Sequence, residues 1–191
     1  TVIGGISLDR SFSQGSDFRY GISLSRRPVT DSLASFAGVR DGRSGLEWGG
    51  VTANGGRLQL SYDDGEVGAY GYGAMHELVG NNAESNSRVE GGTGAYWYLL
   101  NDDSKQLTAG LSLTGISYDK NQSYFTYGNG GYFSPQNFFS IGVPVSWSQR
   151  TNRLSYSLRG SVGLQHIEQD SAPYFPNDNA LQTALAQVSQ V

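Results

Sequence analysis

The 191-residue chain contains no cysteine, which excludes disulfide bonds, thiolate metal sites and cysteine catalysis. Its 13 basic residues are outnumbered by 17 acidic ones, and the formal net charge is −4. This balance offers no basic surface of the kind that binds nucleic acid. Proline is scarce, with five residues, and glycine follows no three-residue period. Both collagen and proline-rich disorder are therefore excluded.

Long hydrophobic runs are also missing. No apolar run approaches the roughly 18 residues that a membrane helix needs, and the chain does not open on a basic-then-apolar signal peptide. The mean hydropathy of −0.40 is typical of soluble proteins. A transmembrane β-barrel has a similarly low value, because only every second strand residue faces lipid.

What the chain does contain is alternation of apolar and polar residues, which is typical of strands with one apolar face. Between residues 138 and 148, for example, Phe139, Ile141 and Val143 alternate with Ser140 and Gly142. We expect about eight antiparallel strands. The alternation is clear at 18–25, 57–62, 107–114, 138–148 and 153–165, and weaker at 2–10, 66–77 and 87–99.

Strand length and connection length both favour a membrane protein. Several of the expected strands exceed the 5 to 6 residues typical of globular proteins, and they match the roughly 9 to 11 residues of a membrane-spanning strand. Short turns alternate with long connections, as in outer-membrane barrels. The short turns lie at 63–65, 101–105 and 149–152, and the long connections at 28–56, 78–86, 119–137 and from 168 onward.

We therefore expect an all-β fold, an antiparallel up-and-down transmembrane β-barrel. By the same alternation, Thr1 and the tail after His166 both lie on the side of the long connections. Residues 1–191 then form a single barrel segment, cut from a larger barrel within loops, and the Ala/Leu/Gln-rich end forms a short helix.

Four segments resemble one family, the C-terminal region of cellulose synthase operon protein C. They are RRPVTDSLASFAGVRD at 26–41, WGGVTANGGRLQLSYDDG at 48–65, SRVEGGTGAYWYL at 87–99 and YFTYGNGGYFSPQNFFS at 124–140. The resemblance runs from about Phe18 to Pro176. It implies an outer-membrane porin of about sixteen strands that exports cellulose and follows a periplasmic array of TPR repeats. The implied partners are the glucan polymer, outer-membrane lipid, the TPR region and the inner-membrane cellulose synthase complex.

An export pore for a neutral polysaccharide needs a polar lumen on which sugar rings can slide. Strand parity predicts lumen-facing residues, which are candidates for contact with the polysaccharide: Arg19, Arg57, Gln59, Arg88, Glu90, Tyr96, Tyr98, Arg159 and Gln165. Alternatively, the charged residues among them pair across strands and only solvate the wall.

The connection before residue 139 is rich in aromatic residues and glycine. It folds either into the pore mouth, where it guides the polymer, or onto itself around Asn129-Gly130-Gly131. Its mouth-loop candidates are Tyr124, Phe125, Tyr127, Tyr132 and Phe133. On the opposite strand parity, we expect interfacial aromatic girdles, formed by Phe18, Tyr20, Tyr62, Trp97, Trp147 and Tyr156.

Two other functions stay open. In a soluble carbohydrate-binding β-sandwich, the apolar side chains at alternate strand positions would form a core between two sheets. In a barrel enzyme that acts on lipid, His76 and His166 would take part in hydrolysis, although neither lies in a recognisable catalytic motif. We expect no enzyme activity, cofactor or metal.

Overall fold

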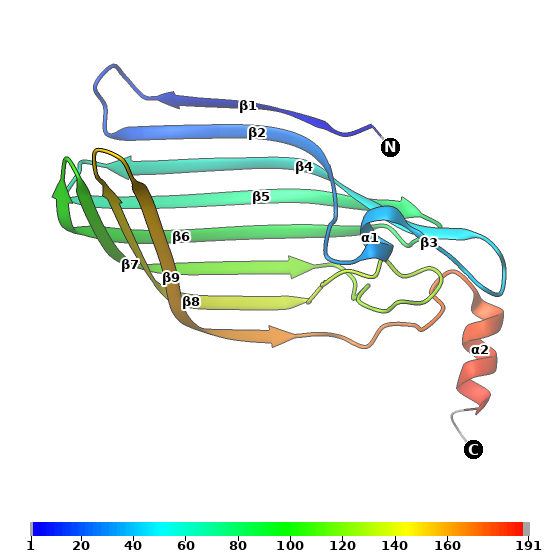
Figure 1. Ribbon diagram of the computed structural model, residues 1–191. Coiled ribbons are helices and arrows are strands. Elements are labelled where there is room, and N and C mark those ends of the chain that lie inside the picture. Colours follow the sequence, from blue (N-terminus) through cyan, green and yellow to red (C-terminus); the bar gives the residue numbers. More distant parts are fainter. Residues whose placement is uncertain (1, 189–191) are drawn as a thin grey trace.

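The computed structural model describes residues 2–188, and nearly all of its regular structure is β (Figure 1). The elements are β1 (Gly4–Ser11), β2 (Phe18–Pro28), α1 (Leu33–Ala37), β3 (Val39–Arg40), β4 (Glu47–Asp63), β5 (Val67–Asn81), β6 (Asn86–Asp102), β7 (Lys105–Tyr118), β8 (Asn137–Arg150), β9 (Ser155–Glu168) and α2 (Asn179–Val188). Neither helix of the described part has the length and apolar character needed to cross a bilayer.

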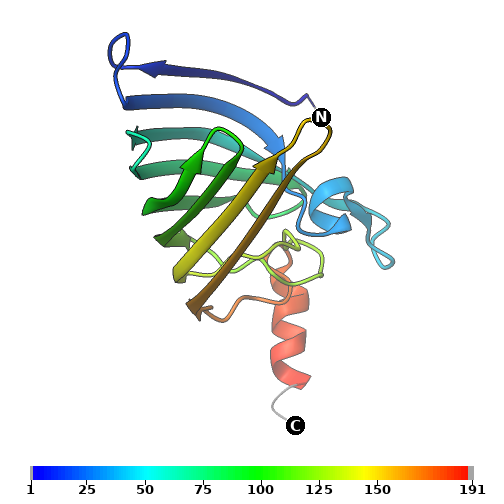
Figure 2. The same ribbon diagram turned by 60° about the vertical axis from the view of Figure 1, so that its left-hand side comes forward.

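The strands form one antiparallel sheet in the order β1-β2-β4-β5-β6-β7-β8-β9, with the short β3 paired to β4 alone. Apart from β3, each strand pairs with the next one in the chain, which confirms the predicted up-and-down, all-β fold. The sheet is curved like a trough (Figures 1 and 2). Its edges, β1 and β9, do not pair with each other within the described residues. Barrel closure therefore stays a prediction, as do the expectations for Thr1 and residues 189–191, which lie outside the described part.

Strand bounds differ most from the prediction in β4. The sequence predicted a strand from residue 57, whereas β4 begins at Glu47. Its first half contains Gly49, Gly50, Gly55 and Gly56, which carry no side chain and so hide the alternation. Gly49 and Gly50 also have φ angles of 88° and 58° and lie where the pairing register to β5 shifts. The predicted link of 28–56 is thus shortened to 29–46, and it holds α1 and β3.

The pairing register separates the sheet into two faces. Residues directly opposite each other on paired strands share a face, and alternate residues along a strand change face. The inner face, which the long connections cover at one end, holds the aligned positions Ser23, Arg57, Ala74, Glu90, Ile116 and Phe138. The neighbouring outer-face positions are Ile22, Leu58, Gly73, Gly91, Gly115 and Phe139.

The outer face leaves its large apolar side chains exposed. Val143, Leu158 and Val162 are 50%, 66% and 81% exposed, and no second sheet covers them within the described residues. The β-sandwich alternative required these side chains to lie between two sheets. The described residues form a single sheet with an exposed apolar face, so the β-sandwich alternative does not apply to this part of the chain.

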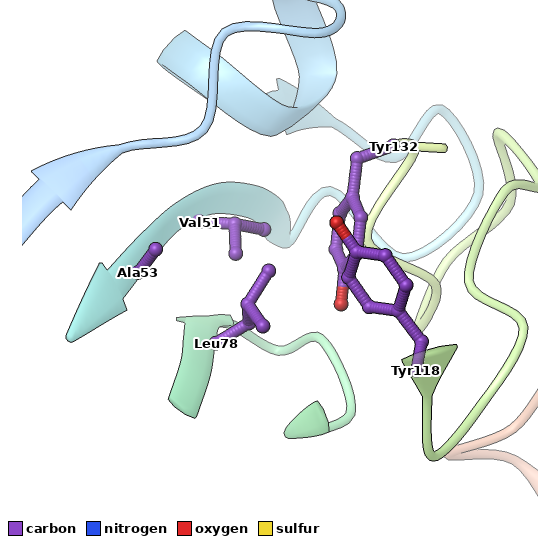
Figure 3. Packing of buried hydrophobic residues seen from close by; sticks show 5 residues of the cluster. All are labelled: Val51, Ala53, Leu78, Tyr118 and Tyr132. Atoms are coloured by element: carbon purple, nitrogen blue, oxygen red, sulfur yellow. The ribbon is translucent and has the colours of Figure 1, made fainter. Parts of the chain in front are cut away.

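A small hydrophobic core lies on the inner face at the end with the long connections (Figure 3). Val51 and Ala53 of β4, Leu78 of β5 and Tyr118 of β7 pack around Tyr132, which comes from the connection between β7 and β8. The rings of Tyr118 and Tyr132 lie 6.0 Å apart at a tilt of 44°. One end of the trough is thus filled by the protein's own side chains.

The other end of the trough is bounded by tight hairpins. In the β4–β5 turn, the Asp64 carboxylate accepts hydrogen bonds from the backbone N–H of Val67 at 2.7 Å and of Glu66 at 2.8 Å. These two bonds, followed by one from the Tyr62 hydroxyl, lower the pKa of Asp64. Gly65 completes the turn with a φ of 85°, which favours glycine. These contacts fix the register that aligns the inner-face residues.

Candidate functional site

The nine residues predicted to line a lumen share the inner face. Arg19 aligns with Ser61 of β4, while Arg57 and Gln59 lie further along the same strand face. Continuing the register across the sheet brings in the rest from β6 and β9: Arg88, Glu90, Tyr96, Tyr98, Arg159 and Gln165. Whether they contact a ligand stays a prediction.

Three of these residues form a charged cluster at the centre of the inner face. Glu90 lies 3.7 Å from Arg57 and 3.3 Å from Arg88, which is also 3.3 Å from the ring of His76. Arg57 additionally donates to the side-chain oxygen of Gln59 at 3.3 Å. The side chains of Arg88 and Glu90 are only 17% and 16% exposed. The pair Arg57–Glu90 joins β4 to β6, as the alternative interpretation expects, whereas Arg88 and Glu90 lie on the same strand. Whether these charges only solvate the wall stays a prediction.

Tyrosines on the inner face lie flat over glycines of the neighbouring strand. A Cβ built on Gly94 would come within 2.7 Å of the Tyr70 ring, and one on Gly92 within 2.6 Å of the Tyr72 ring. Each of these glycines is the direct pairing partner of the tyrosine above it. Without a side chain on the glycine, the ring can rest on the backbone and turn one of its faces away from the sheet.

A third tyrosine–glycine pair is arranged the other way round, with the tyrosine on β6 and the glycine on β5. Tyr96 pairs with Gly68, and a Cβ on Gly68 would clash with the Tyr96 ring. The three tyrosine–glycine pairs follow one another at two-residue steps along the strands, and each step corresponds to about 6.8 Å. The inner face thus carries a row of tyrosine rings parallel to the strand direction.

The three rings are not equally accessible. The Arg57 guanidinium lies 3.6 Å from the centre of the Tyr72 ring and covers it. The Tyr96 hydroxyl donates to the Asp63 carboxylate at 2.6 Å, and Tyr98 donates to the same oxygen at 2.8 Å. These bonds fix the ring of Tyr96 at the hairpin end without covering its face.

Sequence reasoning found Tyr96 and Tyr98 but missed Tyr70 and Tyr72. The segment 66–77 alternates weakly, because glycine and alanine occupy many of its positions. The missed signal was the complementary spacing of glycine and tyrosine: Gly68, Tyr70 and Tyr72 on one strand face Tyr96, Gly94 and Gly92 on the next. A search for paired strands with this exchange would have found the row.

The mouth-loop candidates divide into buried and exposed groups. Tyr132 is 2% exposed, and its hydroxyl oxygen accepts a hydrogen bond at 3.1 Å from the side-chain NH2 group of Asn86. Burial raises the pKa of its hydroxyl. Tyr132 thus serves as an anchor and is not available to a ligand. Tyr127 is half-buried, and the exposed candidates are Tyr124, Phe125 and Phe133.

The long connections interlock at this end. The Ser32 hydroxyl, before α1, donates to the carbonyl of Gly131 at 2.6 Å. The β7–β8 connection in turn holds the segment after β9, where Asn121 donates to the carbonyl of Asp170 at 2.7 Å. The connection packs on itself, as one interpretation expects, and it also covers the inner face through Tyr132. Guidance of a polymer by this connection stays a prediction.

The predicted girdle aromatics lie together on the outer face at the hairpin end. Phe18 pairs with Tyr62, and their rings are 4.7 Å apart. The adjoining strands continue the row on the same face, with Tyr20, Trp97, Trp147 and Tyr156. Phe12, which the sequence did not single out, extends it through edge contacts to Phe18 and Tyr20.

The two histidines do not converge. His76 lies on the inner face beside Arg88, whereas His166 pairs with Phe139 on the outer face and contacts Glu168 at 3.0 Å. A hydrolytic site that uses both rings would need them on one face. The described residues therefore form no single site that uses both rings, and the expectation of no enzyme activity stays a prediction.

Comparison with known proteins links this two-faced sheet to one family. The family described as cellulose synthase operon protein C C-terminus matches residues 1–191. The chain is 58% identical over 95% of its length to cellulose synthase operon protein C of Pseudomonas fluorescens, and 44% identical over 96% to that of Xanthomonas axonopodis pv. citri. The Escherichia coli K12 protein of the same name is 37% identical over 95% of this chain.

The chain spans 14%, 12% and 16% of the lengths of these three relatives. The match is nevertheless complete from the side of this chain, and it includes all four segments that carried the resemblance. The chain belongs to the cellulose synthase operon protein C family and corresponds to its C-terminal region.

Proposed function

We propose that this chain forms part of the wall of an outer-membrane pore through which cellulose or a related glucan leaves the cell. The observation that carries the proposal is the chemistry of the two faces. The outer face exposes apolar side chains such as Val143 and Val162, while the inner face carries polar groups and tyrosine rings. Lipid on one side and a water-filled lumen on the other would satisfy both faces.

Strand length supports the same environment. Strands β4 to β9 contain 14 to 17 residues each. A tilted membrane-spanning strand needs about 9 to 11 residues, so each of these strands is long enough to cross a bilayer. An apolar surface of this extent would favour aggregation if it were left in water. The girdle aromatics at the hairpin end have the amphipathic character that suits the lipid–water boundary.

The inner face supports passive transport of a neutral polymer. At its centre, Glu90 neutralises part of the positive charge of Arg57 and Arg88, so this cluster carries charges of both signs. Tyrosine rings offer stacking surfaces for the apolar faces of sugar rings, and serine, threonine and glutamine offer exchangeable hydrogen bonds. In this proposal the wall performs no catalysis, and the polymer is driven by synthesis elsewhere. The TPR region and the synthase complex implied by the resemblance would be the partners of the whole protein.

Secretion in a cellulose-producing bacterium tests the proposal. Deletion of the gene should abolish cellulase-releasable glucose at the cell surface while isolated inner membranes still polymerise glucan. Re-expression should restore surface cellulose. Unchanged surface cellulose in the deletion strain would contradict the export role.

A matched cysteine pair tests which face lines the path, because the chain has no cysteine of its own. Ser112 lies on the inner face and Val143 on the outer face. In cells that carry Ser112→Cys, a bulky water-soluble thiol reagent should reduce secretion, because the adduct projects into the path of the polymer. Cells with Val143→Cys should be unaffected, and the reverse result would invert the assignment of faces.

A further inference from the structure

The hairpin end of the inner face contains a polar hollow of about 670 Å³ that neither charge pairing nor core packing fills. It lies at the opposite end from the Tyr132 core. Its volume falls within the range of small-molecule sites, about 300 to 1,000 Å³. The residues around it that matter chemically are Asp17, Arg19, Gln59, Asp63, Tyr70 and Tyr96.

We propose that this hollow is a binding subsite for a short stretch of neutral β-linked glucan, with Tyr70 and Tyr96 as the stacking platform. The proposal deepens the export function and rests on it. Both tyrosines lie flat over glycines, Gly94 and Gly68, so that each presents a ring face away from the sheet. Tyr72 is excluded from the platform, because the guanidinium of Arg57 covers its ring.

The platform is preorganised at the Asp63 carboxylate. One of its oxygens accepts from the hydroxyls of Tyr96 and Tyr98, and the other accepts from the backbone N–H of Gly65 at 3.0 Å. The Tyr96 ring is therefore fixed before any ligand binds, which reduces the entropy lost on binding. Asp63 acts here as a positioning residue.

Polar groups around the platform match the hydroxyls of a sugar. Arg19 is exposed beside it, and the Gln59 carboxamide oxygen accepts from Arg57, which leaves the NH2 group of Gln59 as a donor. The charged side chains around the hollow are Arg19, Asp17 and Asp63, so carboxylates outnumber guanidinium groups there. This excess of negative charge disfavours an anionic polysaccharide and leaves a neutral polyhydroxyl chain as the better ligand. The subsite thus lies where strands meet hairpins, at the end opposite the interlocked connections.

Titration of cellohexaose into the purified full chain in lipid nanodiscs, followed by calorimetry, tests the subsite. Tyr70→Ala should weaken binding about three- to ten-fold, the effect of losing one aromatic contact. Tyr70→Phe should bind like the parent protein, because the ring face is kept. Unchanged affinity in Tyr70→Ala would overturn the subsite.

Two glycine-to-alanine variants, which add the same methyl group at different positions, test whether ligand binding needs the Tyr70 ring to lie flat on Gly94. Gly94→Ala should weaken binding to a similar extent, because the new methyl group meets the Tyr70 ring at 2.7 Å and lifts it. Gly73→Ala should not, since its Cβ meets nothing within 4 Å and points to the outer face. Equal effects of the two substitutions on affinity would overturn the platform, and protease resistance checks that each variant folds.

The outcomes separate this subsite from the export function. Restored secretion by the parent protein, combined with no binding of cellohexaose or with equal binding of an anionic oligogalacturonate, would overturn the subsite and leave export intact. Failure of the parent protein to restore secretion would contradict the export function, whatever the result of the titration.

Discussion

At the scale of single residues, Tyr132 joins a long connection to the sheet. Its ring packs against Tyr118, Val51 and Leu78, and its hydroxyl bonds to Asn86. A buried aromatic side chain contributes mainly through the apolar area that it removes from water. Among the aromatic side chains of the connection between β7 and β8, Tyr132 is buried, Tyr127 is half-buried and rings such as Phe125 are exposed. Tyr132 is therefore the aromatic side chain that anchors this connection on the inner face.

We expect Tyr132→Ala to destabilise this connection by about 3 kcal/mol, as large aromatic truncations in cores do. Tyr132→Phe should cost only about 1 kcal/mol, the net contribution of one hydrogen bond. Amide hydrogen exchange across residues 119–136 measures both effects. Phe125→Ala is the control, because its side chain is 67% exposed and should change exchange little. Similar losses from Phe125→Ala and Tyr132→Ala would contradict the anchoring role.

At the scale of elements, each long strand presents two chemistries in alternation. In β8, Val143 pairs with Val162 on the outer face, whereas Ser140 pairs with Gln165 on the inner face. The same holds in β9, where Leu158 and Ser157 are neighbours on opposite faces. The effect of an introduced charge on stability should therefore depend on whether its position faces outward or inward, and not on which strand carries it.

Val143→Arg or Leu158→Arg should destabilise the folded protein in lipid, by about 2 to 4 kcal/mol near the bilayer midplane. Ser140→Arg and Ser157→Arg should be tolerated, because their side chains reach water. Urea unfolding of the protein in lipid vesicles measures the difference. Equal destabilisation from both parities would contradict the orientation of the faces.

The alternation of apolar and polar residues predicted the strands well wherever the positions on both faces carry side chains. Strand β8 was expected at 138–148 and runs over Asn137–Arg150. The first half of β4 and the two-residue β3 were missed, because glycines such as Gly49 and Gly55 give no hydrophobic signal. Parity also placed Arg57 and Glu90 on one face, but the contact between them depends on register, which a single strand does not encode.

At the scale of the whole molecule, the sheet is a trough with unlike ends. Interlocked connections and a small core fill one end (Figures 1 and 3), and tight hairpins bound the other (Figure 1). The outer aromatics and the tyrosine platform lie at this hairpin end. The inner and outer faces meet only at the unpaired edges of β1 and β9 in the described part. In the export function proposed above, the two unlike ends would face opposite sides of the membrane.

The most direct test is a scan of single cysteines along β8 in the membrane-inserted protein, residues 139 to 146. We expect the even positions, such as Ser140→Cys and Ser146→Cys, to react with a membrane-impermeant maleimide. The odd positions, such as Val143→Cys and Val145→Cys, should not react with it, because a thiol in hydrocarbon stays protonated and only the thiolate is nucleophilic. Reaction of both parities with the impermeant reagent, or of the odd positions alone, would contradict a wall with hydrocarbon on one side and water on the other.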